Sequence, residues 1–198
     1  IVAIRPLKDG VIADFDVTEA MLKHFITKLN LKGFLSKPRI LICCPTNITS
    51  VEQKAIREAA EKSGGKKVYL EEEPKVAAIG AGMDIFQPSG NMVVDIGGGT
   101  TDIAVLSMGD IVTSESIKVA GDVFDNDILQ YIKRQYKLLI GERTAEQIKI
   151  TIGTVWPQTR KETMEIRGRD MVTGLPRTIE INSDEIARAL HESVSMIV

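Results

Sequence analysis

Apolar residues recur with helical and strand spacing through the first half of the chain. This pattern predicts a helix capped by Thr18 and a buried strand over residues 39–44. A second helix begins at a capping box, Thr49 with Glu52, and ends before a short strand over residues 67–70. A strand, a helix and a second strand of these lengths predict a βαβ unit with parallel strands. The first helix carries an apolar stripe of Met21, Leu22, Phe25, Ile26 and Leu29.

Later in the chain the pattern changes to short strands joined by tight turns. A helix of small residues over 75–83 precedes a predicted hairpin over 92–106, and a strand over 111–119 extends the hairpin into an antiparallel meander. We expect a boundary between two domains near Pro88. The two domains are expected to face each other across a cleft.

The last part of the chain predicts helices around a small accessory sheet. One helix starts near Gly121, another at Gly141, and a third at the box-like cap of Asn182 with Glu185. Alternating apolar residues between positions 164 and 181 predict the accessory sheet. The first of these helices has an inner face of Phe124, Ile128, Leu129, Ile132 and Tyr136. The fold class is therefore α/β.

Composition narrows the class of protein. The chain has 198 residues, of which 43% are hydrophobic and 26% charged, enough for one large core or two small ones. A net charge of −2 gives no footprint for nucleic acid, and neither a membrane-spanning run nor a signal peptide is visible. We therefore expect a cytoplasmic location. Adjacent Cys43 and Cys44 are interpreted as reduced, buried thiols.

The sequence Asp95-Ile-Gly-Gly-Gly-Thr-Thr-Asp102 predicts a phosphate-binding turn between two strands. Gly97, Gly98 and Gly99 allow positive φ, so that consecutive N–H groups could converge on an anion. Asp95 is suited to hold Mg²⁺ directly or through water, and the hydroxyls of Thr100 and Thr101 could contact a phosphate. The alternative is an ordinary glycine-rich hairpin. The flanking aspartates and threonines favour phosphate binding, and no other nucleotide motif is present.

These motifs resemble the actin, Hsp70 and sugar-kinase ATPase superfamily. Glu73-Pro74 before the turn, Ala120-Gly121-Asp122 after it and the run Gly-Glu-Arg-Thr-Ala-Glu from Gly141 contribute to the resemblance. That last run and residues 4–14 are similar to bacterial actins of the MreB family in particular. The resemblance covers essentially the whole chain and implies an actin-like, ribonuclease H-like fold with two lobes.

The resemblance also implies roles for individual residues. ATP would lie between the lobes with Mg²⁺ near Asp95, and the three glycines would form the second phosphate loop. Glu73 would position the attacking water with help from Thr100, as phosphoryl transfer depends mainly on positioning and charge stabilisation. A solvated acidic turn is the alternative for two of the three glutamates at 71–73. Weaker candidates for contact with ribose and adenine are Glu142, Glu146 and Lys149, for which a solvated helix face is an equal alternative.

In the MreB family the fold divides into subdomains, which the resemblance implies for this chain as well. A first phosphate loop and a second adenine motif are expected before Ile1 and after Val198, so we interpret the chain as an interior segment of a longer protein. The implied divisions are 1–18 for the end of subdomain IB, 19–87 for IA, 88–120 for IIA, 121–182 for IIB and 183–198 for the helix returning to IIA.

Phe34 and Leu35 form an apolar pair in a loop between a helix and a strand. Lys32 and Lys37 flank the pair, a composition that suits shallow insertion into an anionic membrane. Composition alone leaves folding back onto the core equally open, and the resemblance favours the membrane. His24 and His191 are interpreted as surface or packing residues.

Taken with these features, the resemblance implies a slow ATPase that polymerises under the cytoplasmic membrane. Its filaments, homo-oligomers of the chain, would organise the cell-wall elongation machinery and maintain rod shape. An Hsp70-type chaperone domain shares the phosphate turn but leaves the Phe34 and Leu35 loop unexplained. A sugar kinase would need a further carboxylate base, and none is found. A scaffold that binds nucleotide without turnover stays open.

Overall fold

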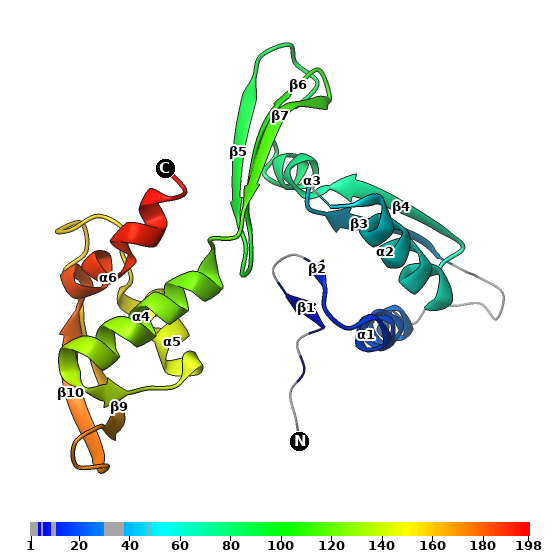
Figure 1. The fold of residues 1–198 in the computed structure, drawn as a ribbon. Helices are drawn as coiled ribbons and strands as arrows, with labels where there is room; N and C mark the ends of the chain where they lie inside the picture. Colours follow the sequence, from blue (N-terminus) through cyan, green and yellow to red (C-terminus); the bar gives the residue numbers. More distant parts are fainter. Residues whose placement is uncertain (1–3, 5, 9–10, 30–37, 47) are drawn as a thin grey trace. The chain divides into compact units, whose positions relative to one another are not determined.

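The computed structural model describes residues 4, 6–8, 11–29, 38–46 and 48–198 of the chain (Figure 1). Its internal contacts divide the chain into two compact units, Ile1–Lys118 and Val119–Val198. They are called unit 1 and unit 2 below, and each is described by itself.

Unit 1 begins with a small hairpin and a helix. Strands β1 (Leu7–Lys8) and β2 (Val11–Ile12) pair antiparallel, and α1 (Phe15–Lys28) follows. The side chain of Asp14 caps α1 by accepting a first-turn N–H, so the prediction of a Thr18 cap is wrong. Thr18 is buried within the helix, where its hydroxyl donates to the Asp14 carbonyl at 2.6 Å.

The apolar stripe predicted for α1 is buried only in part. Phe25, in the second half of the helix, and Leu29, its C-cap residue, are 53% and 68% exposed. Helix α1 packs on the next helix of the chain, and the Ser63 hydroxyl donates to the Glu19 carbonyl in the first half of α1. Helical spacing correctly predicted which face of α1 packs inward. The described residues cover only part of that apolar face, so Phe25 and Leu29 stay exposed.

The predicted βαβ unit is confirmed. Strands β3 (Arg39–Cys44) and β4 (Lys67–Glu72) pair in parallel and are joined by α2 (Ser50–Lys62). The predicted capping box is also present, since Thr49 and Glu52 each satisfy a backbone N–H of the other. Because the strands are parallel, the carboxyl ends of β3 and β4 lie at the same edge of this sheet.

The two cysteines point to opposite faces of β3, as neighbours on a strand do. Cys44 is buried but Cys43 is exposed, so the prediction of two buried thiols is wrong for Cys43. Burial, and then the charge of Glu73, raises the pKa of both thiols above its ordinary value. Both cysteines are free thiols, and the raised pKa keeps them uncharged and weakly reactive at neutral pH.

A three-stranded antiparallel sheet completes unit 1. Helix α3 (Glu73–Gly80) follows β4 without a loop and ends three residues before the predicted position. Strands β5 (Asn91–Ile96), β6 (Thr101–Ser107) and β7 (Asp110–Ile117) form the predicted meander, and α3 packs against it. The core between helix and sheet contains Ala78, Ile85, Ala104 and Leu106, with Met83, Val93 and Ile111 packed against it.

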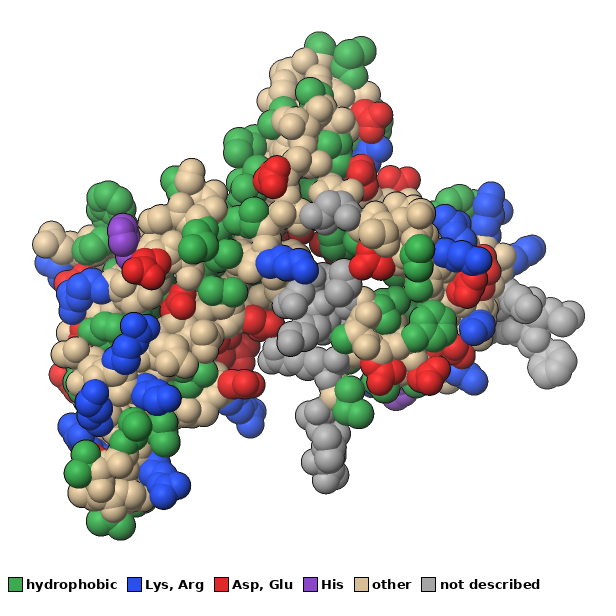
Figure 2. All heavy atoms as spheres, viewed as in Figure 1, with side chains coloured by type: hydrophobic (Ala, Val, Ile, Leu, Met, Phe, Trp, Pro, Cys, Tyr) green, Lys and Arg blue, Asp and Glu red, His purple; other side chains and the backbone are tan. Residues whose placement is uncertain are grey.

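One face of this sheet is apolar and exposed. Alternate residues of β5 lie on it, and apolar side chains are visible over the three strands in Figure 2. Because successive residues of a strand alternate between faces, the same strand presents Val93 to the core of α3. The exposed set comprises Met92, Val94, Ile96 and Val112.

Unit 2 packs three helices against a second antiparallel sheet. The sheet order is β10, β9, β8, which confirms the predicted accessory sheet and all three predicted helices. The capping box of Asn182 with Glu185 is present at the start of the last helix. The elements are α4 (Gly121–Tyr136), β8 (Leu138–Leu139), α5 (Glu142–Ile152), β9 (Thr163–Asp170), β10 (Pro176–Asn182) and α6 (Ser183–Ser195).

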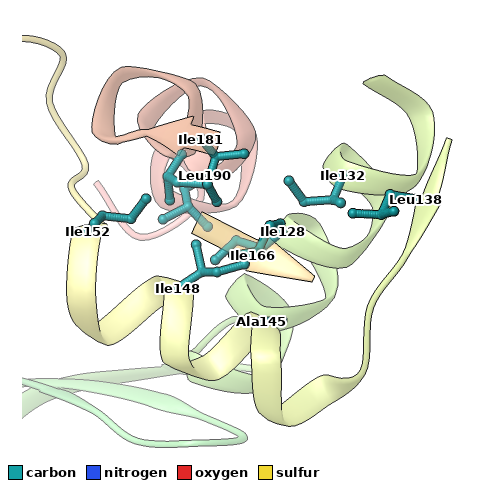
Figure 3. Packing of buried hydrophobic residues seen from close by; sticks show 10 residues of the cluster. Ile128, Ile132, Leu138, Ala145, Ile148, Ile152, Ile166, Ile181 and Leu190 are labelled. Atoms are coloured by element: carbon teal, nitrogen blue, oxygen red, sulfur yellow. The ribbon is translucent and has the colours of Figure 1, made fainter. Parts of the chain in front are cut away.

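The core of unit 2 is built largely from isoleucine. Figure 3 shows side chains from two helices and the sheet converging there, with Leu190 of α6 beside them. The predicted inner residues of α4 all belong to this cluster or pack against it, so that prediction is confirmed. The buried members include Ile128, Ile132, Ile148, Ile152, Ile166 and Ile181.

Truncation of Ile148 tests the importance of this core. Ile148 is fully buried, whereas Ile150 on the same helix is 65% exposed. Ile148→Ala is expected to lower the free energy of unfolding by about 2–5 kcal/mol, because it removes buried methyl groups and leaves a cavity. Ile150→Ala is the matched control and should change it by less than about 0.5 kcal/mol. Urea unfolding followed by circular dichroism measures both, and equal losses would contradict the assigned core.

Candidate functional site

The glycine turn predicted to bind phosphate connects β5 and β6. Its ends are set by the pairing of Ile96 with Thr101, and the N–H of Gly97 donates to the Thr100 carbonyl at 2.9 Å. A Cβ at Gly97 would lie only 3.3 Å from that carbonyl oxygen. A side chain at this position would require that carbonyl to shift by a few tenths of an ångström, so glycine suits the close approach of the backbone here.

Two details of the predicted turn need correction. None of its three glycines has a positive φ, and in the described part of the chain this conformation occurs at four other glycines. The N–H of Gly97 is also used within the turn, so it does not point freely toward an anion. Among the described hydrogen bonds, none uses the N–H of Gly98 or Gly99, and these two remain for a phosphate. The glycines with positive φ are Gly64, Gly82, Gly109 and Gly174.

Two aspartates face each other across this hairpin. Asp95 on β5 and Asp102 on β6 are direct partners in the register, so their side chains lie on the same face of the sheet. Asp102 is only 2% exposed, and its Oδ1 has no hydrogen-bond partner among the described residues. A buried carboxylate oxygen without a partner carries a high desolvation cost, which a cation or its water would relieve.

Glu73 lies close to the two aspartates. It is the first residue of α3, a position favoured for a carboxylate by the helix dipole and followed by Pro74, which suits a first turn. Burial raises the pKa of Glu73, and the charges of Asp102 and Asp95 raise it further, in that order. The structure thus brings together three carboxylates that are spread over 30 positions of the sequence.

A mostly apolar cavity explains part of this burial. The cavity has a volume of about 170 Å³ and is lined by Glu73, Thr18 and apolar residues of α1, β3 and α2. An apolar wall on one side of a carboxylate disfavours its charged form. The side chains on that wall include Met21, Leu22, Ile42 and Ile56.

The donor set fits a magnesium ion held partly by other ligands. Carboxylate oxygens are the ligands that Mg²⁺ prefers, and the unpartnered Oδ1 of Asp102 shows where positive charge is needed. Among the described residues, however, no three His, Cys, Asp or Glu side chains are grouped closely enough to hold a metal alone. Phosphate oxygens and water would have to complete the coordination, as is usual for Mg²⁺.

The remaining residues of the turn differ in accessibility. Thr100 is half-buried at the turn, whereas Thr101 is fully buried at the start of β6. Asp102 was missed as a site residue by the sequence reasoning, although the register of a hairpin around the glycines would have placed it opposite Asp95. Cross-strand pairing in the hairpin could therefore have identified Asp102 as a candidate, whereas its residue type alone did not.

The predicted ribose and adenine contacts belong to unit 2. Glu142 and Glu146 are exposed on α5. The ammonium group of Lys149 already has two partners within the chain. Its Nζ lies 2.9 Å from Asp125 Oδ1 and donates to the Gly121 carbonyl at 3.1 Å. In this structure Lys149 therefore ties α5 to the start of α4.

The predicted membrane loop cannot be compared with the structure. Phe34 and Leu35 lie outside the described residues. In the parts of the chain that are described, none of the helices combines the length and the apolar character needed to span a bilayer. Both histidines, His24 and His191, are exposed.

Replacement of Glu73 tests the electrostatics of the carboxylate cluster. A carboxyl with a raised pKa binds its proton more tightly in the folded chain, so ionisation costs stability as the pH rises through that pKa. Glu73→Gln is therefore expected to raise the urea midpoint at pH 7 and to change it little below the ordinary pKa of glutamate. Glu71→Gln, at an exposed position on β4, should have a small effect at both pH values. Lower stability of Glu73→Gln at pH 7 would contradict the assigned repulsion.

Solved structures with the same fold include MreB5 and MamK. The crystal structure of MreB5 of Spiroplasma citri bound to ADP aligns with a TM-score of 0.92 and 43% identity, over 98% of this chain and 58% of that one. The same protein bound to AMPPNP aligns with a TM-score of 0.91. A MamK double helical filament has the same fold, with a TM-score of 0.77 at 20% identity over 98% of this chain and 57% of its own. The predicted actin-like fold class is thus confirmed.

Sequence comparison gives the same relationship. The chain is 81% identical over its full length to the cell shape-determining protein Mbl of Bacillus subtilis (strain 168) and spans 60% of that relative. It is 50% identical to the cell shape-determining protein MreB of Escherichia coli (strain K12), again over its full length and 57% of the relative. These matches do not favour the chaperone alternative. Residues 1–198 match the family model described as MreB/Mbl protein, and the chain belongs to the MreB/Mbl family.

Proposed function

We propose that this chain carries part of the ATP site of a bacterial actin that determines cell shape. The observation that carries the proposal is the cluster of Glu73, Asp95 and Asp102 beside the glycine turn, with its unpartnered buried oxygen. The names of the relatives support the cellular role, and the ADP and AMPPNP bound to the Spiroplasma citri protein support a nucleotide ligand. The five-part subdomain assignment remains part of this proposal.

In this proposal the glycine turn contacts the phosphates of ATP, and the aspartates contact the magnesium ion that accompanies them. The N–H groups of Gly98 and Gly99 donate to phosphate oxygens, and the hydroxyl of the half-buried Thr100 adds a polar contact at the turn. Asp95 and Asp102 would hold Mg²⁺, directly or through water. The positive charge that Mg²⁺ would supply there offsets negative charge on the phosphates.

Glu73 is proposed to orient the water that attacks the terminal phosphate. A carboxylate with a raised pKa is a stronger proton acceptor than an ordinary glutamate, so it can hold and partly deprotonate that water. Its position at the start of α3, directly after β4, fixes the carboxylate near the turn. Phosphoryl transfer needs mainly such positioning, which suits slow hydrolysis coupled to assembly.

The ribose and adenine contacts proposed for α5 depend on its exposed acidic residues. Glu142 and Glu146 are available to hydroxyl and amino groups of a nucleoside. Lys149 would contribute only if it exchanged its partners Asp125 and Gly121 for the ligand. We therefore give Lys149 the weaker role in the proposal.

The cellular part of the proposal follows the family. The chain would assemble with copies of itself into filaments, lie on the inner face of the cytoplasmic membrane and organise the proteins of cell-wall elongation. Phe34 and Leu35 would insert into the membrane, with Lys32 and Lys37 attracted by anionic lipid. A nucleotide-binding scaffold without turnover is the competing function, and the rate of hydrolysis separates the two.

Phosphate release with Glu73→Gln tests the catalytic role. The variant keeps the size of the side chain but cannot accept a proton, so release is expected to fall about 100-fold in a protein of the relatives' full length that carries this chain. Glu71→Gln is the matched control, two positions away and exposed, and it should keep the parent rate. ATP binding measured in parallel should be retained. Equal rates for both variants would remove Glu73 from the mechanism.

Vesicle co-sedimentation tests the membrane loop. The double variant Phe34→Ala with Leu35→Ala is expected to bind anionic vesicles about tenfold more weakly, because two apolar side chains no longer enter the bilayer. Phe25→Ala with Leu29→Ala is a control of the same composition, since Phe25 on α1 and Leu29 at its C-cap are both exposed. Undiminished binding of the loop variant would show that these two residues do not anchor the protein.

A further inference from the structure

The turn between β9 and β10 exposes an unusual group of apolar side chains. Met171, Val172 and Leu175 are 46%, 83% and 65% exposed, although loops of this length are normally polar. Leu139 of β8, 42% exposed, is the strand partner of Arg169 next to this turn. We call Leu139, Met171, Val172 and Leu175 the apolar tip.

The backbone of the turn is tightly fixed. Asp170 Oδ1 accepts the N–H groups of Val172 and Thr173 at 2.8 and 2.9 Å, and its Oδ2 accepts from Arg177 at 3.0 Å. The N–H of Met171 donates to the Lys137 carbonyl, which ties the turn to the end of α4.

Ionisation of Asp170 maintains these contacts. Hydrogen bonds from Thr173, Arg177 and Val172 lower the pKa of Asp170 to about 2, so the carboxylate remains charged across the physiological range. Gly174, at φ +73°, closes the turn. The apolar side chains are therefore held outward by a rigid backbone.

Basic residues surround the apolar tip. Arg167 and Arg169 are exposed on β9, and Arg177 is partly exposed on β10. The last turn of α4 adds exposed basic side chains, and the hydrogen bond from Met171 to Lys137 places that end of the helix beside the tip. Figure 2 shows Lys and Arg gathered over this end of unit 2. The basic residues contributed by α4 and its cap are Lys133, Arg134 and Lys137.

Acidic residues do not cancel this charge. Asp170 is already engaged with Arg177 and the turn. Glu165 and Glu180 are strand partners of each other, five positions along β9 from Asp170. The apolar tip is therefore bordered by side chains with an excess of positive charge.

We propose that the apolar tip docks onto an anionic lipid bilayer. The apolar side chains lie at the end of a narrow, convex turn, where they could contact the acyl chains of a membrane. The basic side chains lie behind them, where they could contact the phosphate headgroups. A protein partner would need an acidic groove shaped around the turn. The proposal extends the membrane role in the proposed function, but it rests on unit 2 and not on Phe34 and Leu35.

Tryptophan fluorescence provides the direct test. Val172→Trp is made in a Trp156→Phe background, which leaves one tryptophan at the tip. With vesicles containing phosphatidylglycerol, its emission is expected to shift to shorter wavelength and to be quenched by lipids brominated on their acyl chains. Thr178→Trp in the same background is the control, because Thr178 is exposed on β10 away from the turn and should report no insertion. Phosphatidylcholine vesicles should give a much smaller shift.

Combining the Val172→Trp probe with the Phe34 and Leu35 variant separates this inference from the proposed function. With Phe34→Ala and Leu35→Ala present, the Val172→Trp probe should still be quenched by brominated lipid once enough vesicle is added. Val172→Ser with Leu175→Ser should weaken anionic vesicle binding about tenfold, whereas Val155→Ser, at another exposed valine of unit 2, should not.

The inference fails if the Val172→Trp probe is never quenched, even when the chain with an intact loop binds vesicles. A change of emission that depends on protein concentration without lipid would instead assign the tip to contact between copies. A change seen only with an acidic protein would assign it to a protein partner. Either of these results overturns lipid docking but leaves the ATPase proposal intact.

Discussion

The register of one hairpin determines the electrostatics of unit 1. Pairing of β5 with β6 around a short glycine turn places Asp95 directly opposite Asp102, so two negative charges share one face of the sheet. Like charges in this arrangement destabilise a sheet unless something else compensates them. The same face lies near Glu73, whose pKa responds to both aspartates. The folded hairpin therefore concentrates negative charge on one face of its sheet, where positive charge would be stabilising.

Local sequence patterns predicted most of the elements because they depend on local physics. The capping boxes of Thr49 and Asn182, the parallel βαβ unit and the apolar face of α4 all follow from spacing and residue type. Errors occurred where the answer depends on what covers a residue. Cys43 and Leu29 are exposed because no described element packs over them, and a periodic pattern carries no information about its partner surface.

The site was predictable in its residue types more than in its geometry. Asp95 was proposed from the glycine motif and Glu73 from the family resemblance, and the charge of Asp95 acts on the pKa of Glu73 in the structure. Asp102 was missed because its importance comes from cross-strand pairing, and the role of Gly97 was misjudged because its N–H is used inside the turn. Lys149 could not be assigned from sequence either, since its partner Asp125 lies on a different helix. Contacts of this kind depend on tertiary packing.

The direct junction between β4 and α3 sets a limit on insertions and deletions. Strand and helix meet at Glu72 and Glu73 with no residue between them. One added residue would rotate the start of the helix by about 100°, because an α-helix has about 3.6 residues per turn. The carboxylate would then turn away from the hairpin even though every side chain was retained. The spacing between strand and helix is thus as much a part of this site as the glutamate itself.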